Sequence, residues 1–175
     1  MNWDTVGSIS QLVTTIATLV GLVLVLFQLR VAIRTFKADH ERRKKQTTVE
    51  HVREIRPLYT KCRQLVDRKY GSDVLSDKDV EEIVRENGEI RDNLKEILAY
   101  LEFTAIGTNT GVFDKELWYR MSGSYLIRIY HRFRPYIKFA QKNNPYAFIE
   151  FEEIVLEFEE RKRLKPDPRG TIKYS

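Results

Sequence analysis

The feature that most constrains this chain is the absence of any charged side chain between Asp4 and Arg30. The most apolar part of this interval is 12–29, where Leu and Val predominate. A helix over 5–29 would be about 37 Å long, enough to cross a hydrocarbon layer of about 30 Å. Trp3 stands where an interfacial aromatic anchor is typical. The pattern therefore predicts one transmembrane helix at the N-terminus, assigned to residues 1–30.

Two other interpretations of this segment stay open. A cleaved signal peptide has a positively charged start and a small-residue cleavage site, whereas this segment carries Asp4 at its start and runs into Arg30 and Arg34. The core helix of a soluble protein is the second alternative. The length of the uncharged run favours a spanning helix over both.

Basic side chains follow the apolar segment closely, and none precedes it. The positive-inside rule then predicts a single-pass protein with its N-terminus outside and its large domain in the cytoplasm. The basic stalk, residues 31–48, either fixes this topology alone or also meets anionic headgroups. Cys62 is the only cysteine, which excludes an intrachain disulfide and fits a reducing compartment.

One face of the predicted span is small or polar. Small and hydroxyl residues allow close helix approach in a membrane, and Gln hydrogen-bonds across such contacts. We therefore expect a homo-oligomer; the alternatives are a Thr that bonds only to its own helix, or a pore lined by this face. The absence of an ionisable group on the face argues against an ion relay. The residues assigned to self-association are Gln11, Thr14, Thr18, Gly21 and Gln28.

The net charge of +5 conceals blocks of alternating sign. Successive segments carry +8 over 30–69, −7 over 71–118, +6 over 119–142, −6 over 143–160 and +5 over 161–175. This alternation is typical of packed helices with complementary charge. It argues against a nucleic-acid partner.

Apolar residues recur at helical spacing throughout the rest of the chain, and no strand pattern is present. The predicted fold class is all-α: a transmembrane helix that continues into a cytoplasmic helical bundle over 49–164, followed by an extended tail over 165–175. Ser76 and Asp79 resemble a capping box, and Asp114 is a predicted N-cap. A helix over 115–142 has an aromatic inner stripe that includes Met121 and Tyr125, and a last helix is expected over 146–164. Pro57 either kinks a helix or marks a new start.

The aromatic helix also carries a basic cluster, for which two interpretations stand. The cluster either binds an anionic small molecule or pairs with the acidic last helix through Glu150, Glu152, Glu153 and Glu157, and the charge alternation favours pairing. Its members are Arg128, His131, Arg132, Arg134 and Lys138.

No enzyme motif, cofactor motif or metal-ligand spacing is recognisable, so we expect a non-enzymatic protein with no cofactor and no metal site. His40 and His51 are interpreted as stalk residues. Glu102 stands among apolar residues and is expected to be partly buried and paired with an arginine of the aromatic helix; a catalytic carboxylate is the weaker alternative.

The segment from Leu101 to Leu117 contains the pattern E-x-x-A-I-G…G-x-x-D, formed by Glu102, Gly107, Gly111 and Asp114 with Ala105 and Ile106. It is similar to a bacterial family of unknown function with an N-terminal hydrophobic helix and a helical cytosolic domain. The resemblance, over about residues 49–158, implies a helical fold and a bacterial source; with the predicted topology, this places the protein in the bacterial inner membrane. It carries over no catalytic residue.

These observations predict a membrane-anchored helical interaction module that self-associates and presents its bundle to a cytoplasmic protein or an anionic small molecule. The alternative is a membrane effector or sensor, in bacterial stress or phage defence, that binds an anionic ligand through the basic helix.

Overall fold

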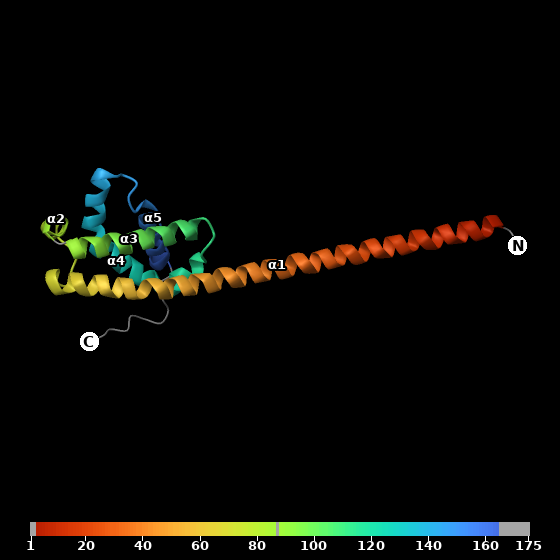
Figure 1. Cartoon of the computed structure of the whole chain (residues 1–175), viewed down its shortest axis with the longest axis horizontal. Helices are drawn as coiled ribbons and strands as arrows, with labels where there is room; N and C mark the ends of the chain where they lie inside the picture. The colour runs from red at the N-terminus through yellow and green to blue at the C-terminus, as the bar shows by residue number, and fades with distance from the viewer. Residues whose placement is uncertain (1–2, 87, 165–175) are drawn as a thin grey trace. The chain divides into compact units, whose positions relative to one another are not determined.

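The computed structural model describes residues 3–86 and 88–164, with side chains from Thr18 onward. Every regular element in these ranges is an α-helix, which confirms the all-α prediction (Figure 1). The tail over 165–175, predicted as extended, lies outside the described residues. The chain divides into two compact units, Met1–Arg43 and Lys44–Ser175.

The first helix, α1, runs from Trp3 to Tyr70. Pro57 lies inside this helix without ending it, so it does not start a new helix. The residue is exposed, and it lacks the N–H that would bond to the carbonyl four residues earlier. The helix ends at Gly71, whose φ of +76° and N–H bond to the Asp67 carbonyl (3.1 Å) close the last turn.

Two short-range caps begin the next helices as the sequence predicts. Helix α2 spans Asp77–Glu86, and the Ser76 and Asp79 side chains bond reciprocally to each other's backbone N–H at 3.2 and 2.8 Å. Helix α3 spans Gly88–Asn109. Helix α4 spans Lys115–Asn143, and its N-cap Asp114 accepts the N–H of Leu117 at 2.8 Å.

Helix α5 spans Ile149–Leu164, three residues shorter at its start than predicted. The segment before it forms a turn in which the N–H of Ala147 bonds to the carbonyl of Asn144 at 2.9 Å. Phe148 then adopts a φ of 60°, a left-handed conformation that no residue of a regular helix holds. The apolar spacing extended into this turn, but the backbone geometry excludes it from the helix.

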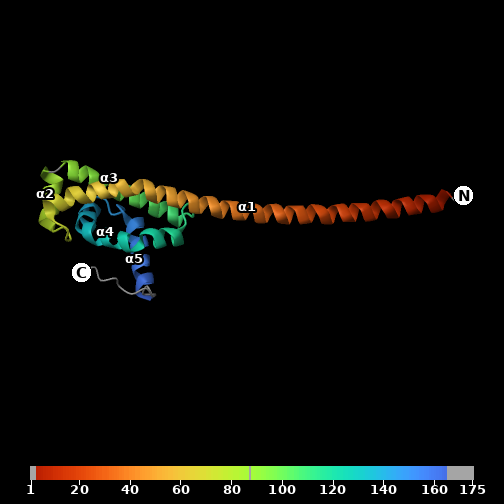
Figure 2. The same ribbon diagram turned by 90° about the horizontal axis from the view of Figure 1, so that it is seen from below.

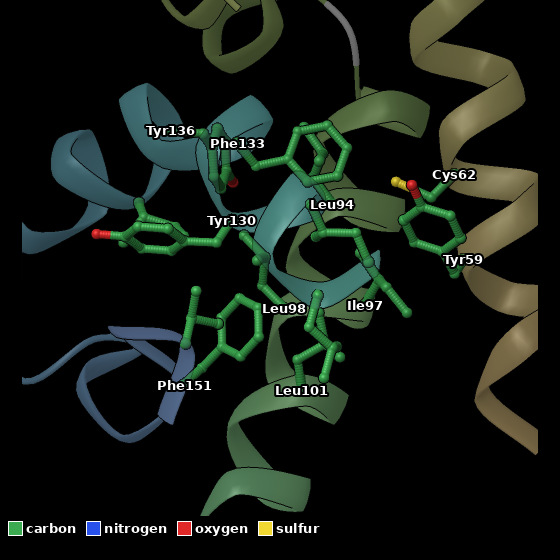
Figure 3. Packing of buried hydrophobic residues seen from close by; sticks show 14 of the residues in the cluster. Tyr59, Cys62, Leu94, Ile97, Leu98, Leu101, Tyr130, Phe133, Tyr136 and Phe151 are labelled. Atoms are coloured by element: carbon green, nitrogen blue, oxygen red, sulfur yellow. The ribbon is translucent and has the colours of Figure 1, made fainter. Parts of the chain in front are cut away.

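The core belongs to the unit Lys44–Ser175, where the end of α1 lies beside α3 (Figure 2). Tyr59 and Cys62 of α1 face Leu94 and Ile97 of α3 (Figure 3). The largest fully buried side chains are aromatic, from α4 and α5: Tyr130, Phe133, Phe151 and Phe158. Buried side chains of all five helices contribute to this core, which is rich in aromatic residues.

Candidate functional site

A groove of about 310 Å³ is lined by α1, α3 and α4 within the unit Lys44–Ser175. Its volume lies at the lower end of the range for small-molecule pockets. It is mostly apolar and aromatic, and its lining contains no acidic residue. The lining residues are Val52, Arg53, Ile55, Arg56, Tyr59, Ile97, Leu101, Trp118, Met121, Ser122, Tyr125, Leu126 and Ile129.

Aromatic and thioether side chains form much of this surface. Tyr59 and Tyr125 meet edge to face, with ring centroids 4.2 Å apart. Met121 and Tyr125 belong to the predicted inner stripe of α4, yet Met121 is 41% exposed and Tyr125 is only half-buried. Helical spacing identifies the face that turns inward, but it does not reveal where the neighbouring helices leave that face uncovered.

Five polar groups in the groove have no partner among the described residues. Two are the guanidinium groups of Arg53 and Arg56, which lie three positions apart on one side of α1. The others are the Trp118 indole N–H and the hydroxyls of Ser122 and Tyr125. Trp118 is 2% exposed, but its indole nitrogen is not among the buried polar atoms that lack a partner, so this N–H is open to the groove. The groove therefore holds unused hydrogen-bond donors beside an apolar surface.

A second cluster joins α1 to the start of α4. His51 bonds to the Thr104 hydroxyl at 2.8 Å and stacks on Phe113, with ring centroids 4.5 Å apart. Burial lowers the pKa of His51, against the opposing charge of Glu54. His51 is therefore part of the helical domain, and its interpretation as a stalk residue is wrong.

The glycines of the E-x-x-A-I-G…G-x-x-D pattern make this cluster possible. A Cβ on Gly107 would lie 2.5 Å from the Phe113 ring, so only glycine admits the ring here. Gly111 has a φ of +84°, which favours glycine. Asp114 caps α4 and donates its own N–H to the Thr48 hydroxyl at 2.8 Å. Gly107, Gly111 and Asp114 thus each have a structural role that accounts for their place in the pattern.

Glu102, the first residue of the pattern, caps α5 from α3. Its two carboxylate oxygens accept the N–H groups of Glu150 (3.3 Å) and Phe151 (2.8 Å), in the first turn of α5. Burial raises the pKa of Glu102, and the two N–H donors oppose that shift. The expected arginine partner is therefore replaced by backbone donors, because Phe148 at the N-cap position has no side-chain oxygen to offer.

The basic cluster of α4 is divided between several environments. His131 pairs with Glu159, and Lys138 contacts Glu152 at 3.0 Å, so both face α5. Arg128 is exposed, and Arg134 is exposed near the Tyr130 hydroxyl. Acidic residues of α5 thus already hold two of the proposed ligand-binding cations.

Arg132 lies in the core side of α4, where it is 7% exposed. Its guanidinium pairs with Asp67 of α1 and donates to the Gly71 carbonyl at 2.6 Å. It therefore joins the end of α1 to α4 and is buried, whereas Arg128, one turn earlier on the same helix, is exposed. The charge pattern predicts one cluster, but its five side chains, between residues 128 and 138, meet different neighbours.

Of the residues assigned to self-association, Gln11 and Thr14 lie outside the described side chains. Thr18, Gly21 and Gln28 are exposed on α1. A Cβ on Gly21 would meet nothing within 4 Å. Among the described residues, no group of His, Cys, Asp and Glu side chains could hold a metal ion.

The described residues thus define an all-helical protein in which one helix is long and apolar enough to cross a membrane. The chain belongs to the family DUF4760, a domain of unknown function, whose model matches residues 15–158. No curated protein and no solved structure matches the chain. The expected membership of an uncharacterised family is confirmed, and a bacterial source stays a prediction.

Proposed function

We propose that this protein is a membrane-anchored, non-enzymatic helical module that self-associates through α1 and presents its helical unit in the cytoplasm of a bacterium. In this proposal the N-terminus lies outside the inner membrane, and a soluble partner binds the unit Lys44–Ser175 in the cytoplasm. It rests on the apolar part of α1.

The observation that carries the proposal is the exposure of this segment. Nine large apolar side chains between Leu19 and Leu29 are 52% to 65% exposed, and no residue of the apolar window is buried by the chain itself. A patch of this kind on a soluble monomer would promote aggregation. Hydrocarbon would accommodate it, since each Leu or Val favours the centre of a membrane by about 0.3–0.6 kcal/mol.

Two further observations favour an anchor over the other interpretations of the segment. A core helix of a soluble protein is mostly buried, whereas this segment is not. A cleaved signal peptide would end at a small-residue site, whereas α1 runs on through basic side chains to Tyr70.

The polar face of α1 supports self-association. Gly21 is open, and Gln28 is exposed among apolar neighbours. A polar side chain that faces lipid is unfavourable, and contact with a second helix removes it from lipid. The effector alternative, with an anionic ligand on the basic helix, has less support because His131, Arg132 and Lys138 are already paired.

The test is the mass of the full-length protein in a neutral detergent, measured by light scattering. The monomer mass is 20.8 kDa. We expect a defined oligomer, and we expect Gln11→Leu, Thr14→Leu and Thr18→Leu together to convert it to monomer. The matched control is Leu19→Ala, Val23→Ala and Leu26→Ala together, on another face of the same helix.

Loss of the oligomer in the polar-face variant alone would support the proposal. A monomeric wild-type protein would overturn self-association. An oligomer that survives the polar-face variant would move the contact to the helical unit, and a protein that stays soluble without detergent would overturn the anchor.

A further inference from the structure

The unused donors of the groove between α1 and α4 are the starting point. Trp118, Ser122 and Tyr125 each bring a polar hydrogen to an apolar surface, and none of the described residues accepts it. A hydroxyl accepts as well as donates, but an indole N–H only donates. A ligand that pairs with the indole must therefore supply a hydrogen-bond acceptor.

The charge of the groove further limits the class of ligand that can bind there. Arg53 and Arg56 line it, and no carboxylate does. Two other cations of the same unit have carboxylate partners: Lys115 reaches Glu157 at 2.7 Å, and Lys69 reaches Glu82 at 2.5 Å. Guanidinium groups at i and i+3 on a helix suit a small planar anion such as a carboxylate. The groove thus combines two free cations with an uncharged interior.

The interior itself is apolar. Four of its lining side chains are at most 3% exposed: Ile97 and Leu101 of α3, and Leu126 and Ile129 of α4. The protein itself covers these four side chains, so the accessible apolar surface of the groove comes from Val52, Met121 and Tyr125, which are less completely covered. The groove, of about 310 Å³, has room for a single hydrocarbon chain of medium length.

We propose that the groove lined by α1, α3 and α4 binds a free, single-chain amphipathic carboxylate of medium length. The hydrocarbon chain lies against Val52, Met121 and Tyr125, and the carboxylate meets Arg53 and Arg56. The site lies wholly within Lys44–Ser175, so it goes beyond the proposed membrane function and does not depend on it.

Octanoate is the probe for the test, and Trp118 is the reporter. The chain has two tryptophans, so Trp3→Phe leaves the Trp118 signal alone. The full-length Trp3→Phe protein is reconstituted in phosphatidylcholine vesicles and titrated with octanoate, octan-1-ol, acetate or inorganic phosphate. We expect saturable quenching or a spectral shift with octanoate, weaker binding of octanol, and no response to acetate or phosphate.

Arg53→Gln with Arg56→Gln tests the head group. We expect this pair to weaken octanoate binding by about tenfold and to leave octanol binding unchanged, because only the charge-assisted bonds are lost. Both side chains are exposed, so the fold is retained, and circular dichroism checks this. Arg128→Gln, an exposed arginine outside the groove, is the matched control and is expected to bind as the parent does.

Ser122→Leu tests the chain site, because a larger side chain there fills part of the groove. We expect it to weaken octanoate and octanol alike. The proposal is overturned if octanoate gives no saturable response, or if the arginine pair binds octanoate as tightly as the parent. It is also overturned if Arg128→Gln weakens binding while the groove variants do not, which would place the anion on the basic helix instead.

Discussion

The carboxylate of Glu102 on α3 holds the first turn of α5 by accepting the backbone N–H of Phe151 at 2.8 Å. The second oxygen accepts the N–H of Glu150 at 3.3 Å. These are the two donors that an N-cap side chain normally satisfies, and here the cap comes from another helix. Glu102 is thus a structural residue, although a partly buried carboxyl of this kind resembles a catalytic one in isolation.

Replacing Glu102 tests this assignment. Glu102→Ala leaves two N–H groups at the start of α5 without an acceptor, so we expect the free energy of unfolding to fall by about 1–2 kcal/mol. Glu102→Gln keeps one acceptor oxygen and should lose less. Urea unfolding of the detergent-solubilised protein, followed by circular dichroism, measures both. Equal stability of Glu102→Ala and the wild type would contradict the capping role.

Glu152 makes the stability of the protein depend on acidity. Burial opposes its ionisation, but hydrogen bonds from Gln141, Tyr130 and Lys138 lower its pKa to about 2, from an ordinary value of 4.5. A depressed pKa contributes stability that is complete above the unfolded pKa and disappears as pH falls to the folded one. We therefore expect Glu152 to contribute on the order of 1–3 kcal/mol near neutral pH, and that part to vanish between pH 4.5 and about 2.

The measurement is urea unfolding of the wild type and Glu152→Gln across this pH range. The two curves should differ near neutral pH and converge at the acid end. Glu153→Gln, at an exposed neighbouring position, is the control and should follow the wild type. A constant difference between wild type and Glu152→Gln at every pH would exclude the titration of Glu152 as the cause.

Gly107 and Gly88 offer a matched pair of glycine substitutions in α3. A Cβ at 107 would collide with the Phe113 ring at 2.5 Å, whereas at 88 its nearest contact is the end of the Arg91 side chain at 3.6 Å. We expect Gly107→Ala to destabilise the protein by about 1–3 kcal/mol and to remove the stacking of Phe113 on His51. Gly88→Ala should be neutral or slightly stabilising, since Ala favours helices. Thermal unfolding of both variants checks this, and a neutral Gly107→Ala would show that Phe113 moves freely.

Arg132 and Arg128 separate a structural role from a binding role on α4. Arg132→Glu places a negative charge beside Asp67 and removes the bond to the Gly71 carbonyl, so we expect a loss of about 3 kcal/mol or more. Arg128→Glu changes an exposed side chain and should alter stability by less than about 0.5 kcal/mol. A normally folded Arg132→Glu protein that has lost an anionic ligand would instead favour the effector hypothesis.

The proposed topology predicts which end of the chain an impermeant thiol reagent reaches. In intact bacterial cells that produce the protein, Asn2→Cys should be labelled by a membrane-impermeant maleimide, and Ser175→Cys only after lysis. The wild type is the control, because Cys62 is buried and should stay unlabelled in both conditions. Labelling of Ser175→Cys in intact cells would reverse the orientation.

Much of the fold follows from local rules that the sequence displays. Ser76 with Asp79, and Asp114 alone, were identified as caps because a capping residue acts on the next three residues. The end of α1 at Tyr70 is also a local event, since Gly71 closes the last turn by bonding to the Asp67 carbonyl. The start of α5 was placed three residues too early, because the apolar spacing continues through a turn whose backbone, at Phe148, is left-handed.

The sites depend on long-range contacts, and for that reason the sequence predicted them poorly. Neither the partner of Glu102, 48 and 49 residues away, nor the contact of His51 with Thr104, 53 residues away, is encoded in any local spacing. The groove lies where three helices leave Met121 and Tyr125 uncovered, which periodicity assigns to the core. The sequence shows the basic cluster of α4. Only the packing shows that His131 and Lys138 pair with carboxylates of α5, and that Arg132 pairs with Asp67 of α1.

Cys62, enclosed between α1 and α3, has a consequence for the redox behaviour of the protein. It is 1% exposed, and burial raises the pKa of its thiol to about 12. The thiolate is the form that reacts with oxidants and disulfides, and here it is both scarce and inaccessible. Any assembly of folded chains is therefore held by non-covalent contacts, and oxidative stress leaves the only sulfhydryl of the protein untouched.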